Sequence, residues 1–325
     1  MTQIENRMET HLEQIRGLLW DIGSQAESAL YGARKALFER DADLAYRVIL
    51  DDHPLDRKSR RCDSFCHDFI GRFLPGAGVQ REMTATIRIN AILERIGDHA
   101  VTVCREALRL ERSLPAQFCR RIDSIADESL SLLSAARSSF REGDAEQAMS
   151  VIHSARQLES RMDSYYAELF SEDERLDATT MMVIFVVFNI YKRVADQAGN
   201  ICEQAVYTVR GTGPSPDACR ILFMAGQDSD LAQEALSIAG AHFAENVSFS
   251  ASGPEISASD LGETTVVVGL NRPVSDFVST VPFHTTVQNW TIPPGADEAE
   301  RRNFMLERLT DLVERISGNP DRSDR

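Results

Sequence analysis

Long apolar segments are missing from this chain. The longest run of apolar residues covers 181–188 and has only eight members. A helix needs about 20 apolar residues to cross a bilayer, so we predict no transmembrane segment. The first residues, Met1-Thr-Gln-Ile-Glu, contain no apolar core of a secretion signal. We therefore expect a cytoplasmic protein.

Positive charge is also scarce. The 325 residues include 35 Lys and Arg against 50 Asp and Glu, which gives a net charge of -15. Proteins that bind nucleic acid or anionic membranes are usually basic, so neither partner is expected. The six cysteines, in a chain without a secretion signal, are expected to be reduced thiols.

Glycine and proline are sparse up to residue 211. Apolar residues recur there at intervals of three and four, which is the period of an amphipathic helix. Asp41 and Asp144 are placed to act as N-caps. We predict six long helices, separated by breaks at 39–41, 74–78, 113–115, 142–144 and 171–174.

Two of these helical stretches repeat one pattern. Leu93-Glu-Arg-Ile-Gly-Asp-His-Ala100 lies about 98 residues before Tyr191-Lys-Arg-Val-Ala-Asp-Gln-Ala198. Segments 38–45 and 140–148 are a second pair with similar sequences. An internal duplication explains both. We predict an all-α fold of tandem three-helix bundles, with one repeat over 1–112 and the other over 113–212.

The first copy of the motif carries two carboxylates on one helix face. Glu94 and Asp98 are four residues apart, and Asp52 and Asp56 have the same spacing on the preceding helix. If these helices are antiparallel, the four carboxylates converge and repel one another unless a cation lies between them. Carboxylates suit magnesium, manganese or iron. The residues alone leave a second interpretation open, an ordinary solvated face.

The composition changes after Gly211-Thr-Gly-Pro-Ser-Pro216, which we interpret as a linker. Beyond it, short apolar or β-branched segments alternate with two predicted helices. This alternation predicts a small α/β domain with a parallel sheet over 219–325. The segments are 220–225, 247–250 and 264–268, and the helices are 229–243 and 297–317.

The helical motifs resemble the PhoU family of phosphate-signalling regulators. The matching stretches are Asp41–Ile49, Ile92–Asp98 and Asp196–Glu203, and the likeness extends over about 5–211. The resemblance implies two three-helix repeats whose acidic motifs bind a metal cluster of magnesium, manganese or iron. It also implies homo-oligomers such as dimers, and a phosphate transporter, a sensor histidine kinase or both as partners.

The same resemblance implies a ligand role for particular acids. In the first repeat the implied metal ligands are Asp52, Asp56, Glu94 and Asp98. In the second repeat they are Glu159, Asp163 and Asp196. Lys192 and Ala155 stand there at the positions of Glu94 and Asp52. We predict a competent site in repeat one and a degraded site in repeat two, where an ammonium group replaces the metal.

Residues 219–318 resemble the low-molecular-weight protein tyrosine phosphatase and arsenate reductase family. The similar segments are Ile221–Met224, Gln233–Leu236, Ser250–Gly253 and Trp290–Ala296. That family's chemistry needs a thiolate, an arginine that holds the oxyanion, and a general acid.

Here the nucleophile position holds Ala225, the loop 226–231 has no arginine, and Pro294 stands at the acid position. We therefore expect an inactive, pseudo-phosphatase domain kept for binding or assembly. An ordinary α/β domain remains the alternative.

Together these features predict a non-enzymatic, metal-binding regulator of phosphate transport or phosphate-responsive signalling. Two other functions stay open. One is a metal-dependent enzyme that uses the helical carboxylates, although the Glu-x-x-His motifs of di-iron bundles are missing. The other is a sensor that binds an oxyanion through the C-terminal domain.

Overall fold

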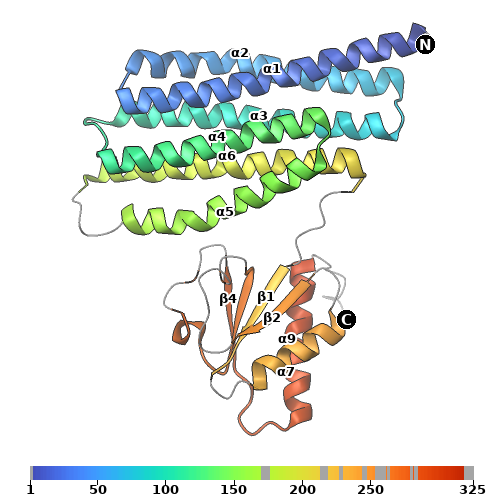
Figure 1. The fold of residues 1–325 in the computed structure, drawn as a ribbon, viewed down its shortest axis with the longest axis vertical. Helices are drawn as coiled ribbons and strands as arrows, with labels where there is room; N and C mark the ends of the chain where they lie inside the picture. The colour runs from blue at the N-terminus through green and yellow to red at the C-terminus, as the bar shows by residue number, and fades with distance from the viewer. Residues whose placement is uncertain are drawn as a thin grey trace. The chain divides into compact units, whose positions relative to one another are not determined.

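The chain folds into two compact units, 1–214 and 215–325, as a computed structural model shows (Figure 1). The side chains of residues 3–5, 159, 160, 163, 168 and 317 lie outside the description. The residues that the structure describes are 3–169, 176–212, 219–226, 230–243, 247–252, 261, 264–278, 281 and 285–317.

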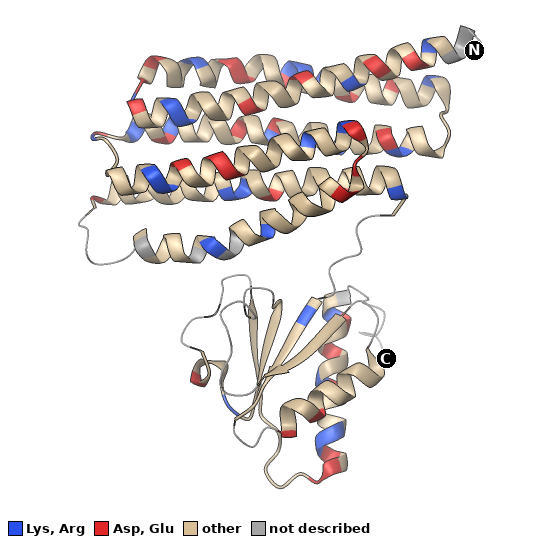
Figure 2. Cartoon of the chain, in the orientation of Figure 1, with Lys and Arg blue, Asp and Glu red and all other residues tan. Residues whose placement is uncertain are grey.

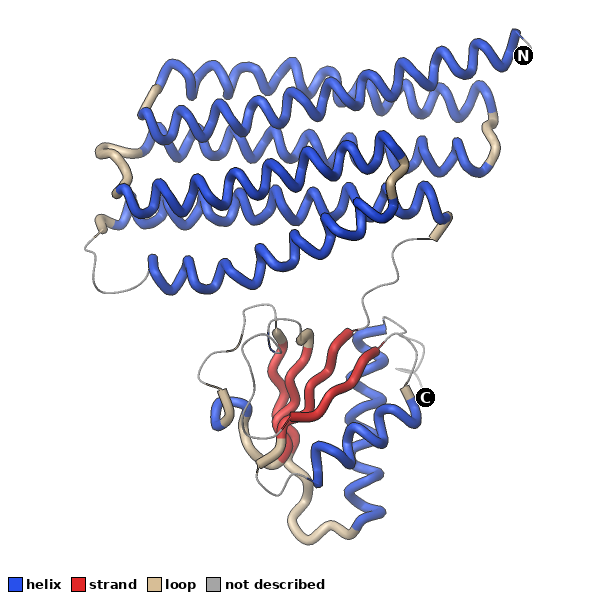
Figure 3. Tube along the Cα trace, viewed as in Figure 1, coloured by secondary structure: helices blue, strands red, loops and turns tan. Residues whose placement is uncertain are grey.

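The described part of the first unit consists of six helices (Figure 3). The prediction of helical bundles is thus confirmed, and the helices begin and end close to the predicted breaks. Their bounds are α1 Gln3–Glu39, α2 Ala42–Phe73, α3 Ala77–Arg109, α4 Ala116–Glu142, α5 Ala145–Leu169 and α6 Ala178–Arg210.

Aspartates begin three of these helices. Asp41 accepts a hydrogen bond from the Leu44 amide at 2.9 Å, as the sequence predicted. Asp144 accepts from two amides of the first turn of α5 at 3.0 and 2.9 Å. Asp177, which the sequence analysis missed, caps α6 through the Thr180 amide at 3.0 Å. Each cap satisfies an amide that the helix itself leaves without a partner.

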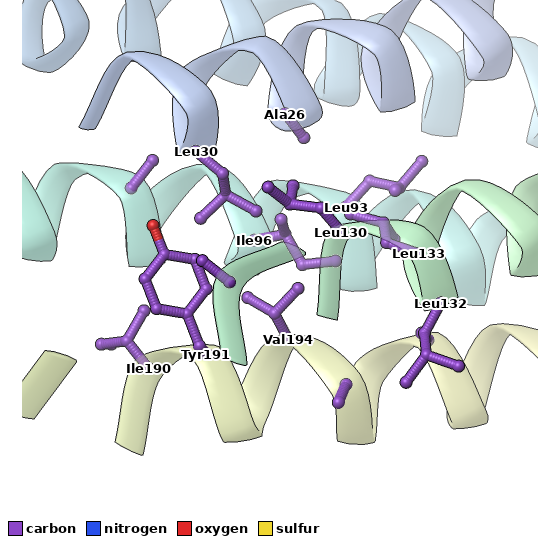
Figure 4. Close-up of a cluster of buried hydrophobic side chains, with 14 of the residues drawn as sticks. Ala26, Leu30, Leu93, Ile96, Leu130, Leu132, Leu133, Ile190, Tyr191 and Val194 are labelled. Carbon is purple, nitrogen blue, oxygen red and sulfur yellow. The ribbon is translucent and has the colours of Figure 1, made fainter. Parts of the chain in front are cut away.

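A single apolar core runs through all six helices. Figure 4 shows part of it, where α1, α3, α4 and α6 meet. Ile96 of α3, Leu133 of α4 and Val194 of α6 are fully buried there. Because the core is continuous, the two repeats form one compact unit, although they are separate in sequence.

Arg137 joins the two repeats inside this unit. It lies on α4 with its side chain only 5% exposed, and its guanidinium pairs with Glu27 of α1 at 2.6 Å. It also donates to the Trp20 carbonyl at 2.9 Å and lies over the Trp20 ring at 4.3 Å. Gly23 makes room, because a Cβ there would lie 2.3 Å from the guanidinium.

α6 is apolar for much of its 33 residues. By length and composition it is the one helix among the described residues that is capable of crossing a membrane, a weak signal that core helices also give. Tyr191, Val194 and Ala198 of this helix are buried in the common core. Packing therefore accounts for part of its apolar character, while Met182 and Phe185 remain exposed.

The second unit contains a parallel sheet, as predicted. In the described residues the strand order is β2-β1-β3-β4, with β1 pairing with both β2 and β3. Figure 2 shows that the strands carry almost no charge, whereas α9 carries both acids and bases. The elements are β1 Cys219–Met224, α7 Asp230–His242, β2 Val247–Ser252, β3 Val266–Leu270, η1 Val274–Asp276, β4 Thr286–Trp290 and α9 Glu298–Ser317.

Both described long helices of this unit pack on one face of the sheet. Ile221 and Phe223 of β1 share a core with Met305 of α9 and with α7. Leu222 points to the opposite face, which Leu261 and η1 cover. β4 was not predicted, because most of its side chains are polar and exposed and give no apolar alternation.

Candidate functional site

The four acids assigned to the first repeat lie where α2 packs against α3. Leu93, Ile96 and Ala100 are buried and fix the face of α3 that meets the core. Glu94 is then half-buried and Asp98 is exposed at the edge of this face. Packing of the apolar residues thus brings the acids next to the opposite helix.

On α2, Asp52 and Asp56 are both half-buried and flank Leu55, which is buried in the core. Pro54 lies between them inside the helix. Because proline has no amide hydrogen, the carbonyl of Leu50 has no helical partner at this position. The local helix is thereby weakened beside the two acids.

Gly97 sets how closely the two helices approach. A Cβ at this position would lie 3.1 Å from Oδ1 of Asp52 and 3.3 Å from a methyl group of Leu55. The carboxylate of Asp52 therefore lies directly over the glycine of the Glu-Arg-Ile-Gly-Asp motif. A side chain there would displace it.

The structure brings the four acids into mutual electrostatic contact. Burial raises the pKa of Asp52, and the charges of Asp56, Asp98 and Glu94 raise it further, while His53 opposes them. The pKa of Glu94 is raised by burial first and then by Asp98 and Asp56.

Two arginines, Arg95 and Arg60, partly offset the effect on Glu94.

As the side chains stand, no three His, Cys, Asp or Glu groups in the described part of the chain lie close enough together to hold a metal. The metal therefore stays a prediction. The carboxylate oxygens of these four residues are the type of ligand that a hard cation takes. A cation would also relieve the repulsion between the half-buried carboxylates.

The second repeat differs at the equivalent place. Nζ of Lys192 lies 3.1 Å from Oδ2 of Asp196, and the two side chains are 25% and 37% exposed. Ala155, at the position of Asp52, is buried. Glu159 and Asp163 belong to α5, but their side chains lie outside the described residues. Asp196 thus has a cation supplied by the protein itself.

A hollow of about 410 Å³ lies between α3 and α6. Sequence analysis missed it, because it forms only where the motif helices of the two repeats meet. The sequence feature that could have indicated this hollow is the arginine at the same position in each copy of the motif. The lining residues are Arg95, Asp98, His99, Arg193, Asp196 and Gln197.

The residues assigned in the second unit lie at the carboxyl ends of the strands. Ala225 follows β1 and is buried, and Pro294 lies in the turn before α9. Residues 227–229 of the predicted loop lie outside the described residues. Arg272, after β3, lies 3.6 Å from a Cβ built on Gly226. The likeness to a phosphatase stays a prediction.

Fold and site together define a class: a duplicated three-helix protein with acidic motifs on its central helices, joined to a parallel α/β unit. The PhoU domain family model matches residues 19–107. The match includes Asp52, Asp56, Glu94 and Asp98.

PhoU proteins are similar to about two thirds of this chain. The chain is 29% identical over 214 residues to the phosphate-specific transport system accessory protein PhoU homolog of Pseudomonas putida, covering 64% of this chain and 83% of that protein. It is 27% identical over 236 residues to the PhoU accessory protein of Escherichia coli, covering 70% and 96%. The crystal structure of PhoU from Pseudomonas aeruginosa aligns with a TM-score of 0.60 at 28% identity, covering 63% of this chain and 99% of that one.

Proposed function

We propose that this chain is a non-enzymatic accessory regulator of phosphate transport or of phosphate-responsive signalling. The similar proteins are named as accessory proteins of a phosphate-specific transport system, and the likeness covers 64% and 70% of this chain. In this proposal the helical unit contacts a phosphate transporter, a sensor histidine kinase or both, in the cytoplasm. The second unit serves binding or assembly.

The observation that carries the metal part of the proposal is the contrast between the repeats. In repeat one, burial and then the charges of neighbouring acids raise the pKa values of Asp52 and Glu94. In repeat two, Lys192 occupies the equivalent position and pairs with Asp196. A metal bound by Asp52, Asp56, Glu94 and Asp98 would neutralise the first cluster as Lys192 neutralises Asp196.

Metal analysis of the purified full chain tests this part. Glu94→Ala should remove most bound magnesium, manganese or iron, whereas Asp196→Ala should leave the metal content nearly unchanged. Circular dichroism would establish that both variants keep their helices. Equal losses from the two variants would contradict the predicted asymmetry.

The regulatory role has its own test. Affinity purification of the chain from cells grown at high and at low phosphate should recover transporter or kinase subunits. Recovery of neither, in both conditions, would overturn the role. This result is independent of metal content, so the two parts of the proposal can fail separately.

A further inference from the structure

The hollow between α3 and α6 is lined by matching residues from the two repeats. Arg95 and Arg193 stand at the same position of the motif, and so do Asp98 and Asp196. The third pair is His99 and Gln197. The duplication thus places two guanidinium groups at one opening, one from each repeat.

Neither guanidinium, of Arg95 or of Arg193, is held by a hydrogen bond or an ion pair among the described residues, although the charge of Arg95 also acts on Glu94. Both side chains are exposed. Each lies close enough to His99 to lower the pKa of that side chain, after the larger effect of burial. The two positive charges therefore act on the same space.

The two aspartates of the hollow differ in their surroundings. Asp196 pairs with Lys192 at 3.1 Å. Asp98 has no cation paired with it among the described residues, and its charge raises the pKa of Asp52 and Glu94. The two guanidinium groups of the hollow therefore face one uncompensated carboxylate, which leaves a net positive charge there in a protein of net charge -15.

We propose that the hollow between α3 and α6 binds a phosphate-class oxyanion, held between the guanidinium groups of Arg95 and Arg193. Guanidinium forks donate paired hydrogen bonds to phosphate oxygens, and one from each side suits a tetrahedral anion with several acceptors. The Gln197 amide and the His99 ring supply further polar groups. The volume of about 410 Å³ lies within the range of small-ligand sites.

The oxyanion site is argued from the residues that line the hollow. Only the choice of phosphate over other oxyanions rests on the proposed regulatory function. The shared chemistry is a phosphoryl group, which is either free phosphate or an ester on a partner. The direct test is calorimetry of the full chain with inorganic phosphate, sulfate and phosphoserine. Each titration is run once with EDTA and once with excess magnesium.

Two variants and a matched control separate the site from general charge effects. Arg95→Gln and Arg193→Gln should each weaken phosphate binding by about tenfold or more, since each removes charged hydrogen bonds. Arg105→Gln should leave binding unchanged, because Arg105 is an exposed arginine of α3 ten residues, or about 15 Å, along the helix. Circular dichroism reports whether each variant is folded.

Tighter binding of inorganic phosphate than of phosphoserine supports a free ligand, and the reverse supports a phosphorylated partner. The proposal is overturned if the folded wild-type protein binds neither, with or without magnesium. It is also overturned if binding survives in the Arg95→Gln/Arg193→Gln double variant, because an anion held only by metal would behave that way. The regulatory role would still be judged by the recovery of transporter or kinase subunits.

Discussion

Replacing Gly97 by alanine is a sharp test of how α2 and α3 are fitted together. The new Cβ would lie 3.1 Å from Oδ1 of Asp52 and 3.3 and 3.4 Å from the methyl groups of Leu55, where 3.4–4 Å is ordinary contact. Leu55 is buried and has little space to move. The carboxylate or the helix must therefore shift by a few tenths of an ångström.

Two opposing free energies decide the result. Alanine in a helix interior is favoured over glycine by about 1 kcal/mol, whereas overpacking costs about 1–3 kcal/mol. For Gly97→Ala we expect a net change between about 0 and a loss of 2 kcal/mol. Gly17→Ala on α1 is the matched control, because nothing lies within 4 Å of its new Cβ. It should gain about 1 kcal/mol.

Urea unfolding with linear extrapolation measures both variants. The free energy of unfolding of Gly97→Ala should lie about 1–3 kcal/mol below that of Gly17→Ala. Combining Gly97→Ala with Asp52→Ala should recover part of this difference, since one of the crowded groups is removed. If the two glycine variants gain equally, α2 and α3 are not in the close contact described, and the account of Asp52 is wrong.

Three further changes test the charges and the core. Asp52→Asn should raise the unfolding free energy of metal-free protein at pH 7, because burial and neighbouring acids raise the pKa of Asp52. This gain in unfolding free energy should shrink as the pH falls through the raised pKa, because the Asp52 carboxyl of the wild type then takes up a proton and no longer repels its neighbours. Urea titrations at several pH values measure the trend. Arg137→Ala should cost about 1.5–3 kcal/mol, because it leaves the half-buried Glu27 without its partner. A second change, Glu27→Ala, should restore part of the loss in the same assay. Tyr191→Phe should raise the free energy of unfolding by about 1 kcal/mol in thermal or urea unfolding, because the buried Tyr191 hydroxyl has no hydrogen-bond partner among the described residues. A lower free energy of unfolding would show that the hydroxyl does have a partner.

The helices of the first unit were predictable because local signals specify them. Sparse glycine and proline, apolar spacing and the caps Asp41 and Asp144 all act within a few residues. Spacing also placed Glu94 and Asp98 on one face. β4 was missed since an exposed strand of polar residues is held by backbone pairing with β3, which leaves no apolar pattern in the sequence.

The hollow between α3 and α6 was not predictable, because its geometry depends on packing between residues about 98 positions apart. The motif showed that Arg95 and Arg193 are equivalent, but not that they face one opening. The contact of Asp52 with Gly97 is hidden in the same way. Sequence periodicity gives the face of a residue on its own helix, whereas the partner helix is chosen by the whole core.

The duplication gives this chain an internal comparison that a single repeat would lack. Glu94 and Lys192 occupy equivalent positions, and the charge changes sign between them. Both helices belong to one core. The second repeat carries its own cation at Asp196, and under the proposed function the first repeat takes an external one. A ligand held between Arg95 and Arg193 would contact both repeats at once. Because Asp98 both lines this hollow and belongs to the acids of the first repeat, a metal bound by those acids would change the binding of the ligand.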